Sequence, residues 1–158
     1  MRRMTLALAM VLSTATIASA GETPAPEGAK AYFINLKDGD TVTSPVLIRF
    51  GLSAMGIAPA GTEAPNTGHH HLFIDAPPLE GDALNEAIPM DEHHVHFGKG
   101  QTEASVKLSP GKHTLQLVLG DWSHIAHKTP VMSERITVNV EGTEAASAKP
   151  TEAASTKQ

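Results

Sequence analysis

Seven short segments of this chain alternate apolar and polar residues, and turn-forming residues separate them. In the segment SPVLIRFGLS, Val46, Ile48 and Phe50 fall on one face, because successive side chains of a strand point to opposite sides. No segment has a convincing amphipathic helical period. The alternating segments are residues 31–36, 44–53, 69–75, 93–97, 102–108, 112–121 and 131–140. The pattern predicts an all-β fold, a β-sandwich of about seven strands.

The two ends of the chain lack this alternation. Residues 1–20 contain two arginines, a short apolar run and a final Ala-Ser-Ala, which is the pattern of a secretory signal peptide. Residues 21–28 are rich in Pro, Gly and Glu and are expected to form a linker. Residues 142–158 hold the repeat TEAASAKP and TEAASTKQ, typical of a disordered tail. The sequence therefore predicts one folded domain at 29–141, in a periplasmic or secreted protein.

Composition excludes several classes of protein. The chain has no cysteine, so no disulfide can support an exported domain, and the fold must depend on its hydrophobic core. Removal of Arg2 and Arg3 with the signal leaves ten basic residues against seventeen acidic ones, a net charge of −7. A nucleic-acid partner is not expected at this charge. No segment is long and apolar enough for a membrane span.

Several stretches resemble known proteins. LKDGDTVTSPVLIRFGL and LSPGKHTLQLVLGD resemble strand pairs of bacterial immunoglobulin-like domains, which implies an immunoglobulin-like antiparallel β-sandwich. The motifs GHHHLFID, HVHFGKGQTE, PGKHTLQLVLGDWSHIAHKTPVMSE and ITVNV are more specific. Together they resemble the uncharacterised bacterial domain-of-unknown-function family 4399 over about residues 50–140. The resemblance implies an exported immunoglobulin-like domain and brings no established activity.

Two histidine clusters lie in strand-like segments, HHHLFID and HHVHF. If these segments pair antiparallel with Leu72 opposite Val95, their apolar residues share one face, and a slip of one residue would break that face. The histidines on the opposite face are then His69, His71, His94 and His96. His70 and His93 have the parity of the core face and are expected to be half-buried and hydrogen-bonded. His113, at the start of a strand, is expected to have a structural role.

A third cluster lies in GDWSHIAHKTP, after the strand at 112–121. In an immunoglobulin-like sandwich this loop meets the start of the strand that carries the triple histidine. Imidazole and carboxylate are ligands of zinc and copper, and a carboxylate can also orient a ligating imidazole. We therefore predict one copper or zinc ion bound by His71, His94 and His96 with His124 or His127, and with His69 and Asp121 as further ligands or supports.

Three functions are compatible with these residues. The histidine clusters favour a metal-binding protein that is not an enzyme. A second reading is a non-catalytic module that binds a cell-envelope protein and responds to pH, because imidazole titrates near pH ~6.5. A third is a copper oxidoreductase, since HVHFG is similar to the copper-binding HVHEFG of copper-zinc superoxide dismutase. The chain lacks that family's cysteines and the glutamate between histidine and phenylalanine, which weighs against the third reading.

Overall fold

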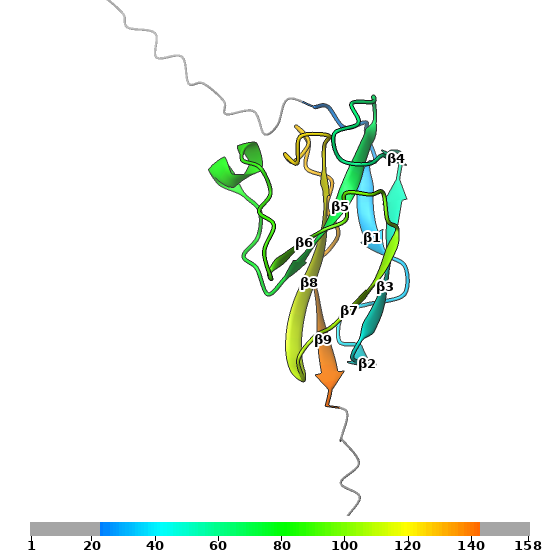
Figure 1. The fold of residues 1–158 in the computed structure, drawn as a ribbon, viewed down its shortest axis with the longest axis vertical. Coiled ribbons are helices and arrows are strands. Elements are labelled where there is room, and N and C mark those ends of the chain that lie inside the picture. Colours follow the sequence, from blue (N-terminus) through cyan, green and yellow to red (C-terminus); the bar gives the residue numbers. More distant parts are fainter. Residues whose placement is uncertain (1–22, 143–158) are drawn as a thin grey trace, which may run out of the picture.

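The computed structural model describes residues 23–142 and confirms the all-β sandwich (Figure 1). The expected signal peptide and all but the first residue of the expected tail lie outside the described residues. One sheet has the order β1 (Lys30–Phe33), β3 (Val46–Ser53) and β7 (Glu103–Val106). The other sheet has the order β2 (Thr41–Thr43), β9 (Ile136–Glu141), β8 (Gly111–Gly120), β5 (Thr67–Ile74) and β4 (Gly56–Ile57), and β6 (His94–His96) also pairs with β5.

The seven expected strands are all present, and the structure adds two short ones. These are β2 and β4, of three and two residues, which are too short to show an alternating pattern in the sequence. Both pair parallel with their neighbours, β2 with β9 and β4 with β5, whereas the remaining strand pairs are antiparallel. The sandwich is therefore antiparallel except at these two edges of the larger sheet.

The main hydrophobic core lies between the two sheets. Ile48 and Phe50 of β3 pack against Leu72 of β5, Leu117 of β8 and Val138 of β9, and all five are buried. The alternation seen in the sequence thus corresponds to side chains that point between the sheets. Burial of such residues stabilises the domain by roughly 1.5–3 kcal/mol per large aliphatic or aromatic side chain.

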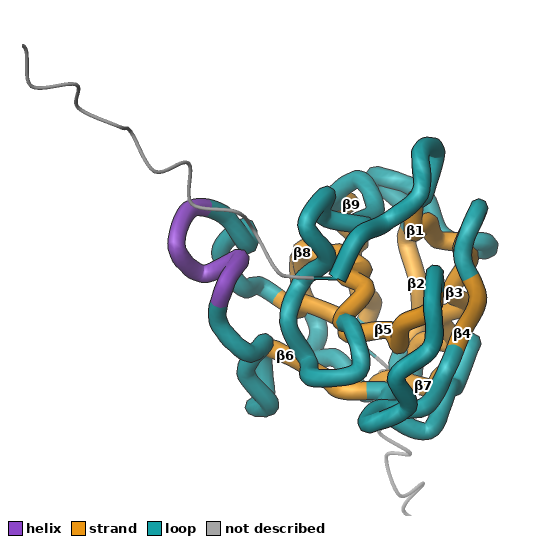
Figure 2. Tube along the Cα trace, turned by 90° about the horizontal axis from the view of Figure 1, so that it is seen from above, coloured by secondary structure: helices purple, strands orange, loops and turns teal. Residues whose placement is uncertain are grey.

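A second, smaller core lies on the outer face of β5 and β8. Phe73 and Val118 are covered there by Leu79 and Ile88 from the long connection 76–92, and by Ala126 from the loop after β8. The connection contains one turn of 3-10 helix, η1 (Gly81–Asn85), which projects to the left in Figure 1. Seen from above, these loops surround the end of the larger sheet (Figure 2). The outer face that carries the odd-numbered histidines of β5 is therefore buried.

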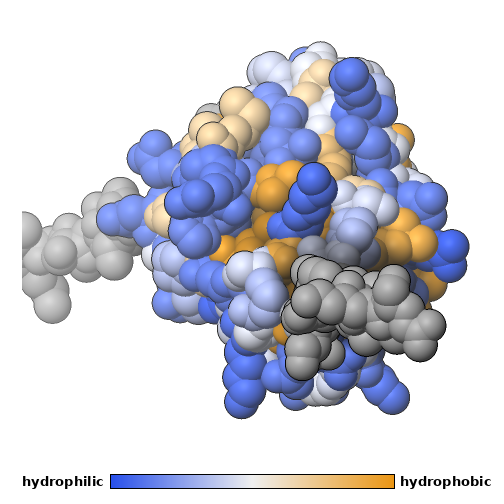
Figure 3. All heavy atoms as spheres, turned by 60° about the horizontal axis from the view of Figure 1, so that its bottom comes forward, coloured by the Kyte–Doolittle hydropathy of each residue, from blue (hydrophilic) through white to orange (hydrophobic). Residues whose placement is uncertain are grey.

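The surface is mixed. On the face shown in Figure 3, hydrophilic side chains surround smaller groups of hydrophobic ones. Large hydrophobic residues with exposed side chains are Tyr32, Ile34, Leu47, Met90 and Trp122. Among residues 23–142, the structure contains no helix of the length and apolarity that a bilayer crossing requires.

Candidate metal centre

The pairing of β5 with β6 follows the register expected from the hydrophobic pattern. Leu72 lies opposite Val95, and His71 lies opposite His96, in antiparallel alignment. Because Leu72 points into the main core, His71 points to the outer face together with His69, two residues earlier. The register thus brings one histidine of β6 beside two histidines of β5.

Three of these imidazoles converge. Each of His69, His71 and His96 offers a ring nitrogen that lies within 4.8 Å of the other two. Their ring centres form a nearly equilateral triangle, with separations of 4.9 Å for His69–His71 and 5.0 Å for the two other pairs. The Nε2 atoms of His69 and His71 face each other at 3.0 Å. Three nitrogens at this spacing could hold one metal ion.

A fourth imidazole lies against this triangle. The ring centre of His124 is 4.9 Å from that of His69, 4.8 Å from that of His96 and 6.0 Å from that of His71. His124 belongs to the loop after β8, which was expected to meet the start of the strand with the triple histidine. The loop and the strands therefore contribute to a single histidine cluster, which we define as His69, His71, His96 and His124.

Asp121 shapes the loop that carries His124. Its Oδ1 accepts hydrogen bonds from the backbone N–H groups of Ser123 and Ile125 at 2.9 and 3.0 Å, and from the Ser123 hydroxyl at 2.8 Å. Its Oδ2 accepts one from the Thr23 hydroxyl at 2.7 Å. Burial tends to raise the pKa of this carboxyl, but the hydrogen bonds from Thr23, Ser123 and Ile125 outweigh it and lower the pKa. Both carboxylate oxygens are thus engaged in supporting the loop.

The surroundings of His69, His71 and His96 favour the neutral form of these three imidazoles. Burial, together with the nearby histidines, lowers the pKa of His69 to about 4 and that of His71 to about 2. Burial and His124 also lower the pKa of His96. Within residues 23–142, no group bonds to Nδ1 of His69, Nδ1 of His71 or Nε2 of His96. Neutral imidazoles with free nitrogens are what metal coordination requires, because a protonated ring has no lone pair to donate.

Two glycines make room for these rings. A Cβ atom at Gly120 would lie 2.9 Å from Nε2 of His71, and one at Gly98 would lie 2.2 Å from Cε1 of His96. Both distances are shorter than side-chain packing allows. No role was predicted for these glycines from the sequence, although Gly120 ends β8 in LVLGD and Gly98 lies just beyond β6 in HVHFG. A glycine at such a position is a signal of close approach by another group.

Two expected ligands lie apart from the cluster. His94 is on the same face as His96, but it lies two residues earlier in the strand, beside Phe73 at 4.6 Å between ring centres, and its Nδ1 is 2.8 Å from Oδ1 of Asp91. His127 is fully buried, with Nε2 3.2 Å from the carbonyl oxygen of Thr67. A Cβ at Gly68 would lie 3.0 Å from Cε1 of His127, which places this ring on the opposite face of β5 from the cluster.

His70 points into the main core. It is fully buried, and its ring centre lies 5.2 Å from that of Phe50. Neither ring nitrogen has a hydrogen-bond partner among the described residues, and burial lowers the pKa to about 4. The expectation of a half-buried, hydrogen-bonded His70 is therefore wrong. His93 is hydrogen-bonded as expected, with Nδ1 2.9 Å from the carbonyl oxygen of Ile74, but it is exposed and not half-buried.

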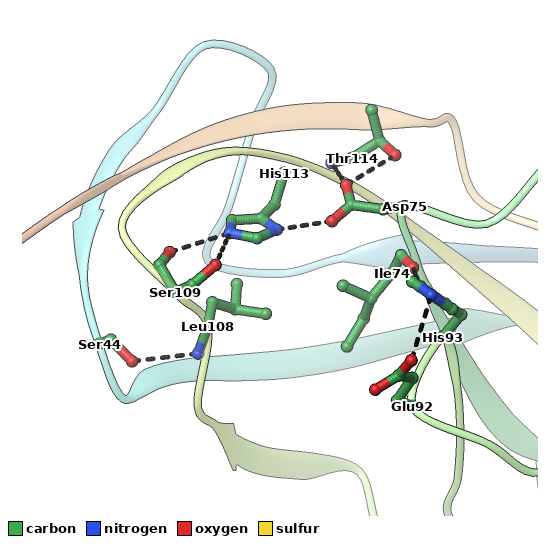
Figure 4. A network of polar contacts seen from close by, with 9 residues as sticks. All are labelled: Ser44, Ile74, Asp75, Glu92, His93, Leu108, Ser109, His113 and Thr114. Carbon is green, nitrogen blue, oxygen red and sulfur yellow. Dashed lines mark hydrogen bonds and ion pairs between the residues drawn. The ribbon is translucent and has the colours of Figure 1, made fainter.

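The opposite end of β5 holds a serine, a histidine and an aspartate in contact (Figure 4). Nδ1 of His113 is 2.6 Å from Oδ2 of Asp75, and its Nε2 is 3.2 Å from the Ser109 hydroxyl. Nε2 is also 2.9 Å from the Ser109 carbonyl oxygen, which can only accept a hydrogen bond. Nε2 therefore carries a proton. A serine nucleophile needs an unprotonated base at this position, so the arrangement fits a structural role and not a hydrolase.

A cleft of about 460 Å³ lies on the outer side of the loop that carries His124. Its lining includes Pro24, Glu63, Pro65, Asn66, Trp122 and Ile125. Trp122 is 43% exposed, and its carbonyl oxygen accepts a hydrogen bond from the Gly61 N–H at 2.9 Å. The cleft and the histidine cluster thus share one loop, which presents Trp122 to solvent and His124 to the cluster.

Comparison with known proteins gives one match. No curated protein and no solved structure matches this chain significantly. The model of a family described as a domain of unknown function, DUF4399, matches residues 48–141. The matched region contains the whole histidine cluster, both glycines that flank it and the loop from Asp121 to His127. The match covers more than half of the chain, and the protein therefore belongs to the DUF4399 family.

Proposed function

We propose that this chain is an exported, non-catalytic protein that binds one zinc or copper ion through His69, His71 and His96. The observation that carries the proposal is the triangle of ring centres, 4.9–5.0 Å on each side, with ligand nitrogens within 4.8 Å of one another. Imidazole is a common ligand of both metals. Export is proposed from the signal-like pattern of residues 1–20.

The electrostatics of the cluster support this function. Each of the three imidazoles keeps one buried ring nitrogen without a hydrogen-bond partner among the described residues, which is costly, and a bound ion would offset this cost. Because burial lowers the pKa of His69 to about 4 and that of His71 to about 2, these two rings stay deprotonated well below pH ~6.5 in the folded protein. Metal affinity should therefore persist to lower pH than an ordinary histidine would allow, as long as the domain remains folded.

Metal analysis of the untagged protein tests the proposal. Protein without residues 1–20 is purified without a histidine tag, and its zinc and copper content is measured by mass spectrometry. The apo protein is then titrated calorimetrically with Zn²⁺ and Cu²⁺. One ion per chain supports the proposal. A protein that contains no metal and releases no heat with either ion contradicts it.

The cleft beside Trp122 favours a second candidate, an interaction module that binds a cell-envelope protein. An exposed tryptophan next to a largely apolar cleft is typical of a binding surface. Replacing Trp122 by alanine would then abolish capture of an envelope protein and leave metal content unchanged. If the variant captures the same proteins as the wild type, this second candidate fails.

A further inference from the structure

The spacing of four imidazole rings depends on the coordination geometry of the ion they surround. With a metal–nitrogen bond of about 2.0–2.1 Å and roughly 1.1 Å from nitrogen to ring centre, all six pairs of ring centres lie about 5.2 Å apart around a tetrahedral ion. Around a square-planar ion, four pairs lie about 4.5 Å apart and the two opposite pairs about 6.4 Å. The six separations therefore distinguish the two geometries.

The histidine cluster matches the tetrahedral spacing. Five of its six pairs of ring centres are 4.8–5.0 Å apart, and the sixth, His71–His124, is 6.0 Å apart. In a square-planar arrangement a second long pair, His69–His96, would accompany the first, but this pair is 5.0 Å apart. The four ring centres are thus spaced as around a tetrahedral ion, except that His124 lies farther from His71, and the ring nitrogens that lie within 4.8 Å of one another are those of His69, His71 and His96.

The backbone of His124 is fixed in place. Its carbonyl oxygen accepts a hydrogen bond from the Ile88 N–H at 2.8 Å, and its own N–H donates to the Asp121 carbonyl oxygen at 3.0 Å. His124 has a backbone φ of 70°. Residues other than glycine adopt this conformation at a cost in free energy, and it persists only where the surroundings enforce it. The loop therefore constrains where the His124 ring can lie relative to the other three rings.

We propose that the cluster prefers ions that accept tetrahedral four-nitrogen coordination, foremost Zn²⁺, and that His124, as the fourth ligand, sets this preference. The inference rests on the proposed metal-binding function. Zn²⁺ has no geometric preference from its d electrons and is commonly tetrahedral, whereas Cu²⁺ favours tetragonal sites. With identical ligands free to rearrange, Cu²⁺ binds more tightly than Zn²⁺. A cage held in tetrahedral form narrows that advantage.

The variant His124→Asn tests the role of the fourth ring. Asparagine tolerates a positive φ, so the loop keeps its conformation, and an amide oxygen is a ligand better suited to Mg²⁺ or Ca²⁺ than to Zn²⁺ or Cu²⁺. We expect Zn²⁺ affinity to fall by at least the 10–100-fold that loss of a supporting residue typically costs. Cu²⁺ affinity should fall less, because a water can complete a tetragonal site, so the ratio of Cu²⁺ to Zn²⁺ affinity rises about tenfold or more.

Competition titrations of the wild type, His124→Asn and the control His94→Ala measure this ratio. Co²⁺ provides a second measurement on the same three proteins, because tetrahedral Co²⁺ absorbs visible light far more strongly than octahedral Co²⁺. We expect the strong absorption in the wild type and in His94→Ala, and its loss in His124→Asn.

The outcomes separate this inference from the proposed function. Two results would overturn the tetrahedral preference while one ion per chain still binds. The first is an unchanged ratio of Cu²⁺ to Zn²⁺ affinity in His124→Asn, and the second is weak, octahedral Co²⁺ absorption in the wild type. Failure of Zn²⁺, Cu²⁺ and Co²⁺ alike to bind the wild type overturns the function and the inference together.

Discussion

Two ends of the same strand pair give histidine opposite environments. At one end, His71 of β5 is fully buried, its Nδ1 has no partner in the part of the chain that the structure describes, and burial together with neighbouring imidazoles lowers its pKa to about 2. At the other end, His113 of β8 has Nδ1 2.6 Å from a carboxylate oxygen of Asp75. Burial tends to lower the pKa of His113, but the bonds to Asp75 and to the Ser109 carbonyl outweigh it and raise the pKa.

The difference lies in the partner and not in the secondary structure. A carboxylate keeps an imidazole charged and occupies its nitrogens, so that such a ring ties two segments together and cannot coordinate a metal. Neighbouring imidazoles do the reverse, because like charges disfavour protonation and leave the nitrogen lone pairs free. A histidine-rich sequence of this kind therefore separates into structural rings and candidate ligands according to the charge that each ring faces.

The largest expected effect comes from removing one ring of the cluster. His96→Ala should lower Zn²⁺ affinity by at least about 100-fold, or about 2.7 kcal/mol, because the trio loses one of three nitrogens. His94→Ala, two residues away and bonded to Asp91, should leave the affinity unchanged. Calorimetric titration of both variants measures the contrast. Equal losses in the two variants would show that β6 presents both histidines to the ion.

Acid should lower the free energy of unfolding of the metal-free domain by about 2 kcal/mol or more. This magnitude follows from the lowered pKa values of the buried histidines, because one unit of pKa shift corresponds to about 1.4 kcal/mol. In the unfolded chain the histidines of the cluster bind protons near pH ~6.5. In the folded state burial holds the pKa of His69 at about 4. Between these values the unfolded state binds more protons, so the free energy of unfolding falls as the pH falls from 6.5 toward 4. Urea denaturation at several pH values measures this slope.

The His113–Asp75 pair should make the free energy of unfolding depend on pH with the opposite sign. Because the folded-state pKa of His113 is raised, its contribution to stability is complete below pH ~6.5 and is lost as the pH rises through the folded-state value. Asp75→Asn should therefore lower stability more at pH 6 than at pH 9. A variant whose loss is the same at both values would show that the charge of His113 contributes nothing.

Much of the fold and part of the site could be predicted from the sequence. Alternation along SPVLIRFGLS and KHTLQLVLGD identified the core face, and Leu72 opposite Val95 fixed the register that places His71 beside His96. The register was predictable because a slip of one residue would have placed an apolar side chain opposite a histidine. The convergence of His124 on β5 followed from the expected topology.

Other features depend on contacts that no local pattern encodes. His94 and His96 have the same parity, and only the position of Asp91 and Phe73 along the strand separates them. The connection 76–92 covers the outer face of β5 with Leu79 and Ile88. Such long-range cover has no periodic signal in the sequence.

The glycines beside the cluster offer a smaller test of how closely its rings are packed. Gly98→Ala places a Cβ 2.2 Å from Cε1 of His96 and should displace that ring, lowering Zn²⁺ affinity about tenfold, the lower end of what supporting residues cost. Gly56→Ala is the matched control, because its Cβ would meet Thr67 at an ordinary 3.5 Å. Titration of both variants with Zn²⁺ compares them. If Gly98→Ala binds as tightly as the control, the position of His96 is not set by this close approach.

The smallest expected effect concerns His70, which separates burial from metal binding. His70 neighbours two candidate ligands in the chain, yet it points into the main core with both ring nitrogens unpaired. His70→Leu removes these unpaired polar atoms at similar volume and should raise the free energy of unfolding by about 1 kcal/mol, because a buried polar group without a partner is destabilising. Zn²⁺ affinity should not change, whereas His71→Leu, one residue away on the opposite face, should abolish it. Urea denaturation and Zn²⁺ titration of the two variants give the comparison. A loss of stability in His70→Leu would mean that the imidazole forms a hydrogen bond in solution that its position against Phe50 does not reveal. The buried histidines of β5 could then no longer be divided into ligands on one face and unpaired core residues on the other.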